Sequence, residues 1–245
     1  MTHLFVSDVH LGEDSAPAIG QFLAFLATHA ARAESLYILG DLFESWVGDD
    51  DRSPAALEVC AALKTLTAGG VPCFVLHGNR DFLLGSGFCE RTGCVLLTDP
   101  VVAELDGERV LITHGDALCT DDHSYQELRS IVRRRDMQRR FLALPLGVRE
   151  VLAGEVRAGS RRHIARTVPT IMDVNAAAVE RAFRAADVRR MIHGHTHRPG
   201  VHELMIDGAS AQRIVLGAWY EQGSYLSCER GRYELRSLPR ERRDG

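Results

Sequence analysis

Five short polar motifs constrain this 245-residue sequence most strongly, because each directly follows a run of residues typical of a buried β-strand. In α/β sheets, ligands bind beyond the carboxyl ends of the strands, so the five motifs are expected to meet in one place. Strand residues two apart point to the same side, so both members of the pairs Asp8/His10 and His195/His197 can face one site. The motifs are Asp8-Val-His10, Gly40-Asp41, Gly78-Asn79-Arg80-Asp81, His114-Gly-Asp116 and Gly194-His195-Thr-His197.

The order of the strand-like and helix-like segments favours an α/β fold with a mostly parallel sheet. Apolar strand-like runs alternate with stretches that carry apolar residues at helical spacing, an order typical of a parallel sheet with helices on its faces. The tail after residue 200 alternates short β-like runs with glycine-containing turns, so we expect a second, largely antiparallel sheet there. The strand-like runs are 4–7, 36–39 and 73–76, and the helix-like stretches are 17–32 and 54–66.

The segment 121–167 interrupts this pattern, and we expect it to be a helical cap inserted into a core made of residues 1–120 and 168–245. It has no β-like run and indicates two or three helices. Between Tyr125 and Arg166 there are 11 arginines against four acidic residues, and the apolar run 141–148 lies among them. Such a cap could bind a phosphate-bearing lipid. The alternative is a structural insertion whose apolar residues pack on the core and whose arginines are solvated.

The bulk composition excludes several classes of protein. The net charge of −4 and the pI near 6.3 show no overall basic excess, so no nucleic-acid partner is expected. The six cysteines form no CxxC pair, which favours reduced core cysteines. The first residues do not resemble a signal peptide, and no run approaches the roughly 18 apolar residues of a membrane span. We therefore expect a cytoplasmic protein that at most attaches to a membrane surface.

Seven side chains in the motifs offer metal-binding atoms, which is too many for one transition metal but suits two that share a carboxylate. Mixed imidazole, carboxylate and amide donors favour Mn²⁺, Fe or Zn²⁺ over Ca²⁺. Two such cations attract a multiply charged phosphate and lower the pKa of a bridging water, so we predict hydrolysis of a phosphate ester or anhydride by a metal-bridging hydroxide. The donors are Asp8, His10, Asp41, Asn79, His114, His195 and His197.

The ordered motifs DxH, GD, GN, HG and GHxH resemble those of the calcineurin-like metallophosphoesterases. The resemblance implies an α/β fold of the αββα type, a two-sheet β-sandwich flanked by helices, with a dinuclear metal site and here an inserted helical cap. It also implies that Asp41 bridges the two metals. One metal would take Asp8, His10, Asp41 and His197, and the other would take Asp41, Asn79, His114 and His195.

Arg80 is a departure from the pattern of this family. Many members carry a histidine directly after the asparagine, often as the group that stabilises the transition state or protonates the leaving group. A guanidinium can bind phosphate through two hydrogen bonds but cannot act as a general acid near neutral pH. We therefore assign Arg80 to the catalytic set with the seven metal donors, and we expect an anhydride substrate whose leaving group is itself a phosphate.

Longer stretches resemble one subfamily, which hydrolyses the diphosphate of UDP-2,3-diacylglucosamine, an acylated UDP-sugar lipid, in lipid A biosynthesis. The resemblance implies two Mn²⁺ ions per chain, with UMP and 2,3-diacylglucosamine 1-phosphate as products. It also implies a peripheral protein on the cytoplasmic surface of the inner membrane, and we expect a monomer. The stretches are 37–46, 48–51, 77–84, 114–122, 171–175 and 193–199.

The same resemblance predicts the residues that contact the substrate. Two further positions, an asparagine and a lysine in the subfamily, are Ile164 and Thr167 here, and Arg166 could replace the charge of the lysine. Arg157 joins the set because it lies one helical turn before Ser160. The predicted contacts are Asn79, Arg80, Asp122, Arg157, Ser160 and His195.

Two other functions compete with this hypothesis. The first is a metallophosphoesterase that acts on another nucleotide diphosphate or on a phosphodiester. The second is a non-catalytic metal-binding scaffold, although such scaffolds usually lack some of the ligands. Four further polar residues in or next to the motifs are expected to be structural or to support the ligands rather than to bind metal: His77, Asp81, Asp116 and His193.

Overall fold

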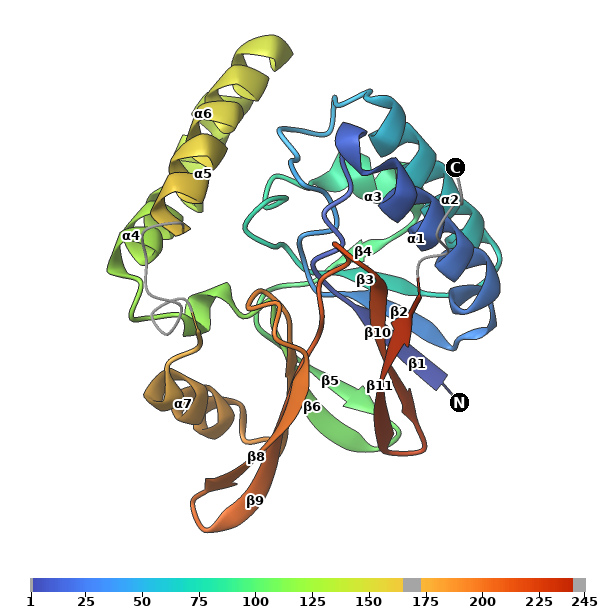
Figure 1. The fold of residues 1–245 in the computed structure, drawn as a ribbon, viewed down its shortest axis with the longest axis vertical. Coiled ribbons are helices and arrows are strands. Elements are labelled where there is room, and N and C mark those ends of the chain that lie inside the picture. Colours follow the sequence, from blue (N-terminus) through green and yellow to red (C-terminus); the bar gives the residue numbers. More distant parts are fainter. Residues whose placement is uncertain (1, 165–172, 240–245) are drawn as a thin grey trace.

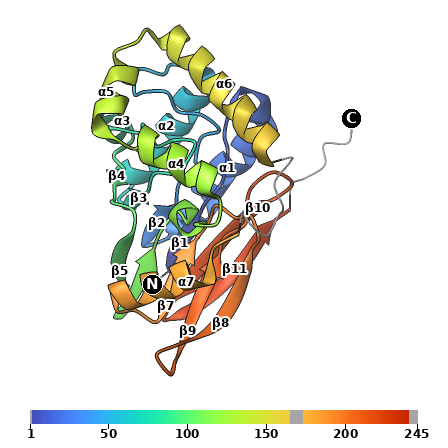
Figure 2. The ribbon, with the colours of Figure 1, turned by 90° about the vertical axis from the view of Figure 1, so that its left-hand side faces the viewer.

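Two sheets form the centre of the computed structural model, which describes residues 2–164 and 173–239. In Figures 1 and 2 the sheets lie against each other, with helices on the outer sides. The first sheet contains, in order, β11 (Arg232–Leu238), β10 (Gly223–Glu229), β1 (Thr2–Val6), β2 (Ser35–Ile38), β3 (Cys73–Val75) and β4 (Val95–Leu96). The second contains β5 (Val101–Leu105), β6 (Glu108–Ile112), β7 (Arg190–His193), β9 (Ala209–Val215) and β8 (Gly200–Ile206).

Alternate residues of the central strands face different layers of core. In β1, Leu4 and Val6 pack on the helix side of the first sheet, whereas Phe5 packs between the two sheets. In β6, Ile112 faces the layer between the sheets and Leu111 faces the opposite side, under α7 (Ala176–Ala186). Because both faces of these strands are buried, they have the uninterrupted apolar sequences noted above. The outer helices on the first sheet are α1 (Ala16–Thr28), α2 (Pro54–Ala68) and α3 (Ser86–Thr92).

The predicted parallel sheet is confirmed for β1 to β4, which pair in parallel. The prediction for the tail was wrong in one respect, because the tail divides between the sheets. Strands β10 and β11 join the first sheet, where β10 lies antiparallel to β1, while β8 and β9 join the second. The second sheet is mixed rather than largely antiparallel, since β7 pairs in parallel with both β6 and β9. The free edge of β1 accepts β10, whose Tyr225 and Leu226 are buried on opposite faces.

Three helices connect β6 to the region before α7, and they stand to one side of the two sheets (Figure 1). They are α4 (His123–Val132), α5 (Arg135–Leu142) and α6 (Leu146–Ile164). Neither α4 nor α5 contains a buried residue. We call α4–α6 the cap helices. The predicted boundary near residue 167, together with Arg166 and Thr167, lies outside the described residues.

Within residues 2–164 and 173–239, no helix combines the length and the apolar character that a membrane span requires.

Candidate metal centre

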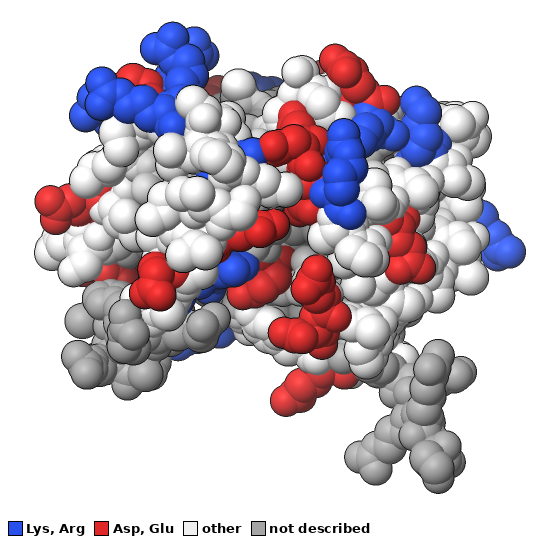
Figure 3. Space-filling view, turned by 90° about the horizontal axis from the view of Figure 1, so that it is seen from above, with Lys and Arg blue, Asp and Glu red and all other residues white. Residues whose placement is uncertain are grey.

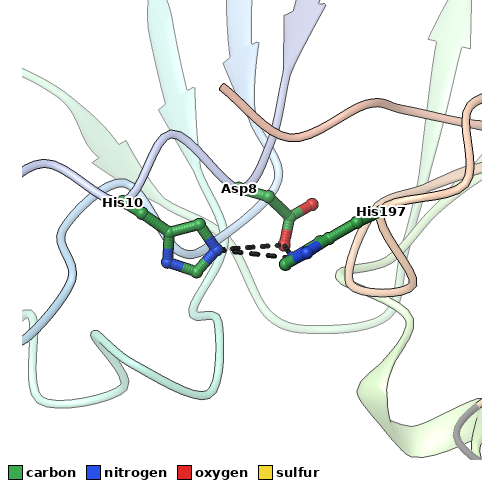
Figure 4. Close-up of side chains that lie close together, drawn as sticks. All are labelled: Asp8, His10 and His197. Atoms are coloured by element: carbon green, nitrogen blue, oxygen red, sulfur yellow. Dashed lines mark hydrogen bonds and ion pairs between the residues drawn. The ribbon is translucent and has the colours of Figure 1, made fainter. Parts of the chain in front are cut away.

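The loops that follow β1, β2, β3, β6 and β7 bring all seven predicted donors together. Figure 4 shows one part of this cluster, in which Asp8 and His10 face His197. The His197 Nε2 atom lies 3.2 Å from Asp8 Oδ1 and 3.4 Å from His10 Nε2. The three residues form a group whose donor atoms all lie within 4.8 Å of one another.

The remaining donors lie directly beside this group. The Asn79 Oδ1 atom is 3.0 Å from His114 Nε2 and 2.9 Å from His195 Nδ1. Asp41 lies between the two parts, with Oδ2 3.8 Å from His10 Nε2 and Oδ1 3.9 Å from His114 Nε2. The two oxygens of one carboxylate therefore face histidines of both parts, which is the position that a bridging ligand requires.

The orientation of His114 indicates what this cluster can bind. Its Nδ1 atom donates a hydrogen bond to the backbone oxygen of Leu39 at 2.8 Å. This leaves Nε2 to face the side-chain oxygens of Asn79 and Asp41, which are acceptors. A nitrogen and oxygens that converge in this way can hold a cation, either a proton on Nε2 or a metal ion that replaces it. The residues present therefore fit a divalent metal centre.

Burial and mutual charge shift the pKa values of these groups strongly. Burial raises the pKa of Asp41 to about 6, although the neighbouring histidines oppose that shift. Burial alone would lower the pKa of His114, but the carboxylates of Asp41 and Asp8 raise it to about 9. Burial likewise disfavours ionised Asp8, yet its hydrogen bond to His197 and the nearby imidazoles hold its pKa far below the usual range. Metal binding would thus replace protons held within the cluster.

The backbone at the cluster is strained. Five of the seven donor residues have a positive φ between 52° and 67°, which non-glycine residues adopt infrequently. Such strain persists only where surrounding contacts impose it, and it concentrates at functional sites. These residues are Asp8, His10, Asp41, His195 and His197.

Asp81 holds together two of the loops that carry the donor residues. Its fully buried carboxylate accepts hydrogen bonds from the backbone N–H groups of Asp41 at 3.2 Å, Leu42 at 2.8 Å and Gly78 at 2.8 Å. The loops approach so closely that a Cβ on Gly78 would overlap the backbone of Asp41. The predicted supporting role of Asp81 is confirmed. His77 also has a structural contact, since its ring Nε2 donates to the backbone oxygen of Leu84.

Two residues that contact the cluster lie outside the five sequence motifs. The carboxylate of Glu44 lies 3.1 Å from His10 Nδ1, on the side of the ring opposite the cluster, where it can orient the imidazole. The ring of Tyr220 stacks on His10 with centroids 5.1 Å apart and also contacts His197 edge to face. Glu44 lies within the stretch 37–46 noted above, but nothing in the sequence distinguished Tyr220.

His193, in β7, is buried and has a structural environment, as predicted. Arg213 donates a hydrogen bond to its Nε2 at 2.9 Å, and its own Nδ1 donates to the backbone oxygen of Gly194. Burial, followed by the charge of Arg213, lowers the pKa of His193 to about 3. The ring is therefore neutral in the folded protein near neutral pH.

This shift predicts a specific acid sensitivity. An unfolded histidine has a pKa near 6.5, whereas the pKa of His193 in the folded protein is about 3. The free energy of unfolding should therefore fall as the pH drops from about 6.5 to about 3, by up to roughly 4 kcal/mol from this residue. Urea titrations of the metal-free protein should show a steeper pH dependence than those of a His193→Gln variant. Parallel curves for the two proteins would contradict the expectation.

Asp116 connects the metal-binding loops to the cap helices. Its carboxylate is fully buried and accepts hydrogen bonds from Tyr125 Oη at 2.6 Å and Arg129 Nε at 2.8 Å, both on α4. Arg133 extends the link by donating to the backbone oxygen of Gly78 at 2.8 Å. The Tyr125 ring also stacks on His195 at a centroid distance of 5.8 Å. Helix α4 is therefore fastened directly to the donor cluster.

A cavity of about 450 Å³ adjoins the cluster, between the core loops and the cap helices. Figure 3 views this end of the molecule and shows acidic side chains gathered in the middle of the face, with basic ones at its upper left and upper right. The buried Nε of Arg80 has no hydrogen-bond partner among the described residues. Aromatic and aliphatic side chains supply much of the wall, among them Trp46, Phe82, Leu128, Phe141 and Leu152.

The structure brings four of the six predicted substrate residues to this cavity: Asn79, Arg80, Arg157 and Ser160. The other two, Asp122 and His195, are not among the residues that line it. The carboxylate of Asp122 accepts a hydrogen bond from the Tyr125 N–H at 3.0 Å and caps the start of α4. His195 remains within the metal-binding cluster.

Comparison with known proteins places the chain in a family. The model of the calcineurin-like phosphoesterases matches residues 1–199. The UDP-2,3-diacylglucosamine hydrolase of Aeromonas hydrophila is 49% identical, covering 96% of this chain and 98% of that protein. Those of Salmonella typhi and Escherichia coli O81 are 47% and 48% identical, each covering 98% of this chain and 100% of the relative.

One solved structure agrees on the fold. A novel archaeal phosphodiesterase aligns with a TM-score of 0.50 at 14% identity, covering 97% of this chain and all of that one. The predicted two-sheet sandwich flanked by helices is confirmed by this alignment and by the three layers of core. The chain belongs to the calcineurin-like phosphoesterase family and is a metal-dependent hydrolase.

Proposed function

We propose that this chain hydrolyses the diphosphate of UDP-2,3-diacylglucosamine to UMP and 2,3-diacylglucosamine 1-phosphate (lipid X), a step of lipid A biosynthesis. The observation that carries the proposal is the largely apolar cavity that opens onto the metal-binding cluster. Asn79 belongs to both, because it lines the cavity and contacts His114 and His195. The names of relatives that are 47–49% identical over nearly the whole chain support the same substrate.

The donor set supports two Mn²⁺ ions, with Fe or Zn²⁺ as alternatives of similar ligand preference. When bound, two such cations would polarise the phosphoryl oxygens and lower the pKa of a water molecule positioned for attack. The bridging ligand would be Asp41, whose oxygens face both halves of the cluster. One ion would be held by Asp8, His10, Asp41 and His197, and the other by Asp41, Asn79, His114 and His195.

The protein's own groups would bind and orient the substrate. The unpartnered Nε of Arg80 is available for the diphosphate, and the adjacent Asn79 side chain can position the same group. On α6, Arg157 and Ser160 line the cavity and can contact the sugar and its phosphate. We also propose that Asp122 and His195 contact the substrate. The acyl chains would fill the space between Trp46, Phe82, Leu128, Phe141 and Leu152.

The cap helices also suit attachment to a membrane that supplies the lipid. Arg135, Arg139 and Arg140 on α5 are exposed, as are Val151 and Val156 on α6. Each basic residue near an anionic bilayer contributes on the order of 1 kcal/mol to attachment. We propose that residues 121–167 form the lipid-binding cap of a monomer that associates peripherally with the cytoplasmic face of the inner membrane. No nucleic-acid partner is proposed.

The deciding experiment compares two substrates. Mn²⁺-dependent release of UMP from UDP-2,3-diacylglucosamine is measured beside UDP-N-acetylglucosamine, which lacks the long acyl chains. We expect turnover of the acylated substrate alone. Equal turnover of both would retain a phosphoesterase but remove the role of the apolar cavity. No turnover of either, with metal shown to be bound, would overturn the proposed substrate and favour another nucleotide diphosphate or phosphodiester.

A further inference from the structure

Helix α6 forms one wall of the cavity, yet it has almost no hydrophobic anchorage. Among the described side chains of the cap helices, residues 123–160, Arg149 is the only one that is buried, with 3% of its surface exposed. Several apolar residues of α6 are exposed, among them Val151 at 67% and Val156 at 52%. The position of α6 therefore depends on one charged side chain rather than on a core of its own.

On the core side, Arg149 contacts a single loop, residues 47–50. Its guanidinium forms a two-pronged ion pair with the Asp50 carboxylate and donates to the backbone oxygen of Val47. Its Nε donates to the backbone oxygen of Leu144 at 2.9 Å, which fixes the turn that leads into α6. Every nitrogen of the guanidinium is thus engaged.

The core side of this contact is held by hydrogen bonds and leaves room for the arginine. Asp49 accepts hydrogen bonds from Trp46 Nε1 at 3.1 Å and from the N–H groups of Gly85 and Gly87 at 3.0 and 2.8 Å. Gly48 has a φ of +148°, and a Cβ there would overlap the Arg149 guanidinium. The loop therefore leaves space that the arginine fills.

We propose that Arg149 and Asp50 form a clasp that positions α6 over the cavity and thereby determines how tightly the acyl chains of the substrate bind. Helix α4 is held separately, through Asp116 and Gly78. The clasp is the corresponding attachment for α6, which contributes Leu152 and Val156 to the cavity wall. The assignment of acyl chains to this cavity rests on the proposed function.

Asp50→Asn tests the clasp, because it preserves the size of the side chain but removes the charge that holds the guanidinium. Arg149→Lys is a second variant, which keeps the charge but loses the two-pronged geometry. The matched control is Asp136→Asn, which makes the same chemical change in the exposed Arg134–Asp136 pair at the start of α5. Asp136 does not line the cavity.

For Asp50→Asn we expect KM for UDP-2,3-diacylglucosamine to rise about tenfold while kcat changes less than about twofold. Hydrogen exchange of the α6 backbone amides over 149–157 should accelerate, while exchange in β1 and β2 stays as in the wild type. Arg149→Lys should fall between Asp50→Asn and the wild type, and Asp136→Asn should match the wild type. A selective rise in KM separates a positioning role from a general loss of structure.

Three results would overturn the clasp. They are an unchanged KM together with unchanged exchange in α6, equal acceleration in β1 and β2, and equal effects of Asp136→Asn and Asp50→Asn. Failure of the proposed function would look different, because the wild type itself would then release no UMP from the acylated substrate. In that case the exchange comparison alone would decide whether the clasp holds α6.

Discussion

Replacing Asp41 with asparagine is expected to lower kcat about a thousandfold or more and to leave fewer than two metal ions bound per chain. The two oxygens of Asp41 face His10 and His114, so in the proposed site the charge of this one carboxylate would serve both halves of the donor cluster. Asparagine retains an oxygen that can accept the 2.8 Å hydrogen bond from the Arg80 N–H. The variant therefore removes the bridging charge and little else.

The fold of Asp41→Asn should survive. Burial raises the pKa of Asp41 to about 6, which is above the value of the unfolded chain, so at pH 7 the ionised carboxylate destabilises the metal-free protein. Removing it should leave the stability of metal-free protein at pH 7 unchanged or higher. Elemental analysis after dialysis gives the metal content, and urea unfolding gives the stability. Asp187→Asn, at a side chain that is 90% exposed, is the matched control. Two bound metals with near-normal kcat would refute the bridging role.

Much of the fold follows from local sequence, because the central strands are buried on both faces and each ends in a polar motif. Leu4, Phe5 and Val6 are all apolar since each faces a core layer, and Asp8 follows at the point where the strand ends. The pairing of β10 with β1 could not be predicted in this way. It joins residues more than 200 positions apart, and it depends on which sheet edge stays open after the other strands have paired.

The donor cluster was predictable for the same reason, since motifs at the ends of neighbouring strands are brought together by the sheet. Contacts made by side chains from outside the motifs were not predictable. Tyr220 reaches His10 from the loop before β10, and no local pattern marks it. Counting charges could not identify Arg149 in the cap, because nothing in the sequence distinguishes it from the exposed arginines around it. Among the described cap residues, only the three-dimensional contacts separate the buried guanidinium of Arg149 from the exposed ones.

Removing the side chain of Arg80 is the second large effect that we expect. Arg80→Ala should lower kcat/KM for the proposed substrate by about a hundredfold to a thousandfold, the range typical of a lost donor to developing charge. The side chain lines the cavity beside Asn79, and its buried Nε has no partner among the described residues, so a phosphate oxygen could complete its hydrogen bonding. The Arg80 backbone N–H would still donate to Asp41, so the cluster itself should keep its metal.

Two further substitutions at this position separate charge from proton donation. Lysine keeps the positive charge but not the two-pronged geometry, so Arg80→Lys should recover part of the lost activity. Histidine could donate a proton, but near pH 8 it is largely uncharged. If the leaving group is a phosphate, which needs little protonation, lowering the pH from 8 to about 6 should not make Arg80→His more active than Arg80→Lys. Higher activity of the histidine variant at about pH 6, where its ring is largely protonated, would mean that proton donation limits the rate, and the anhydride argument built on Arg80 would then fail.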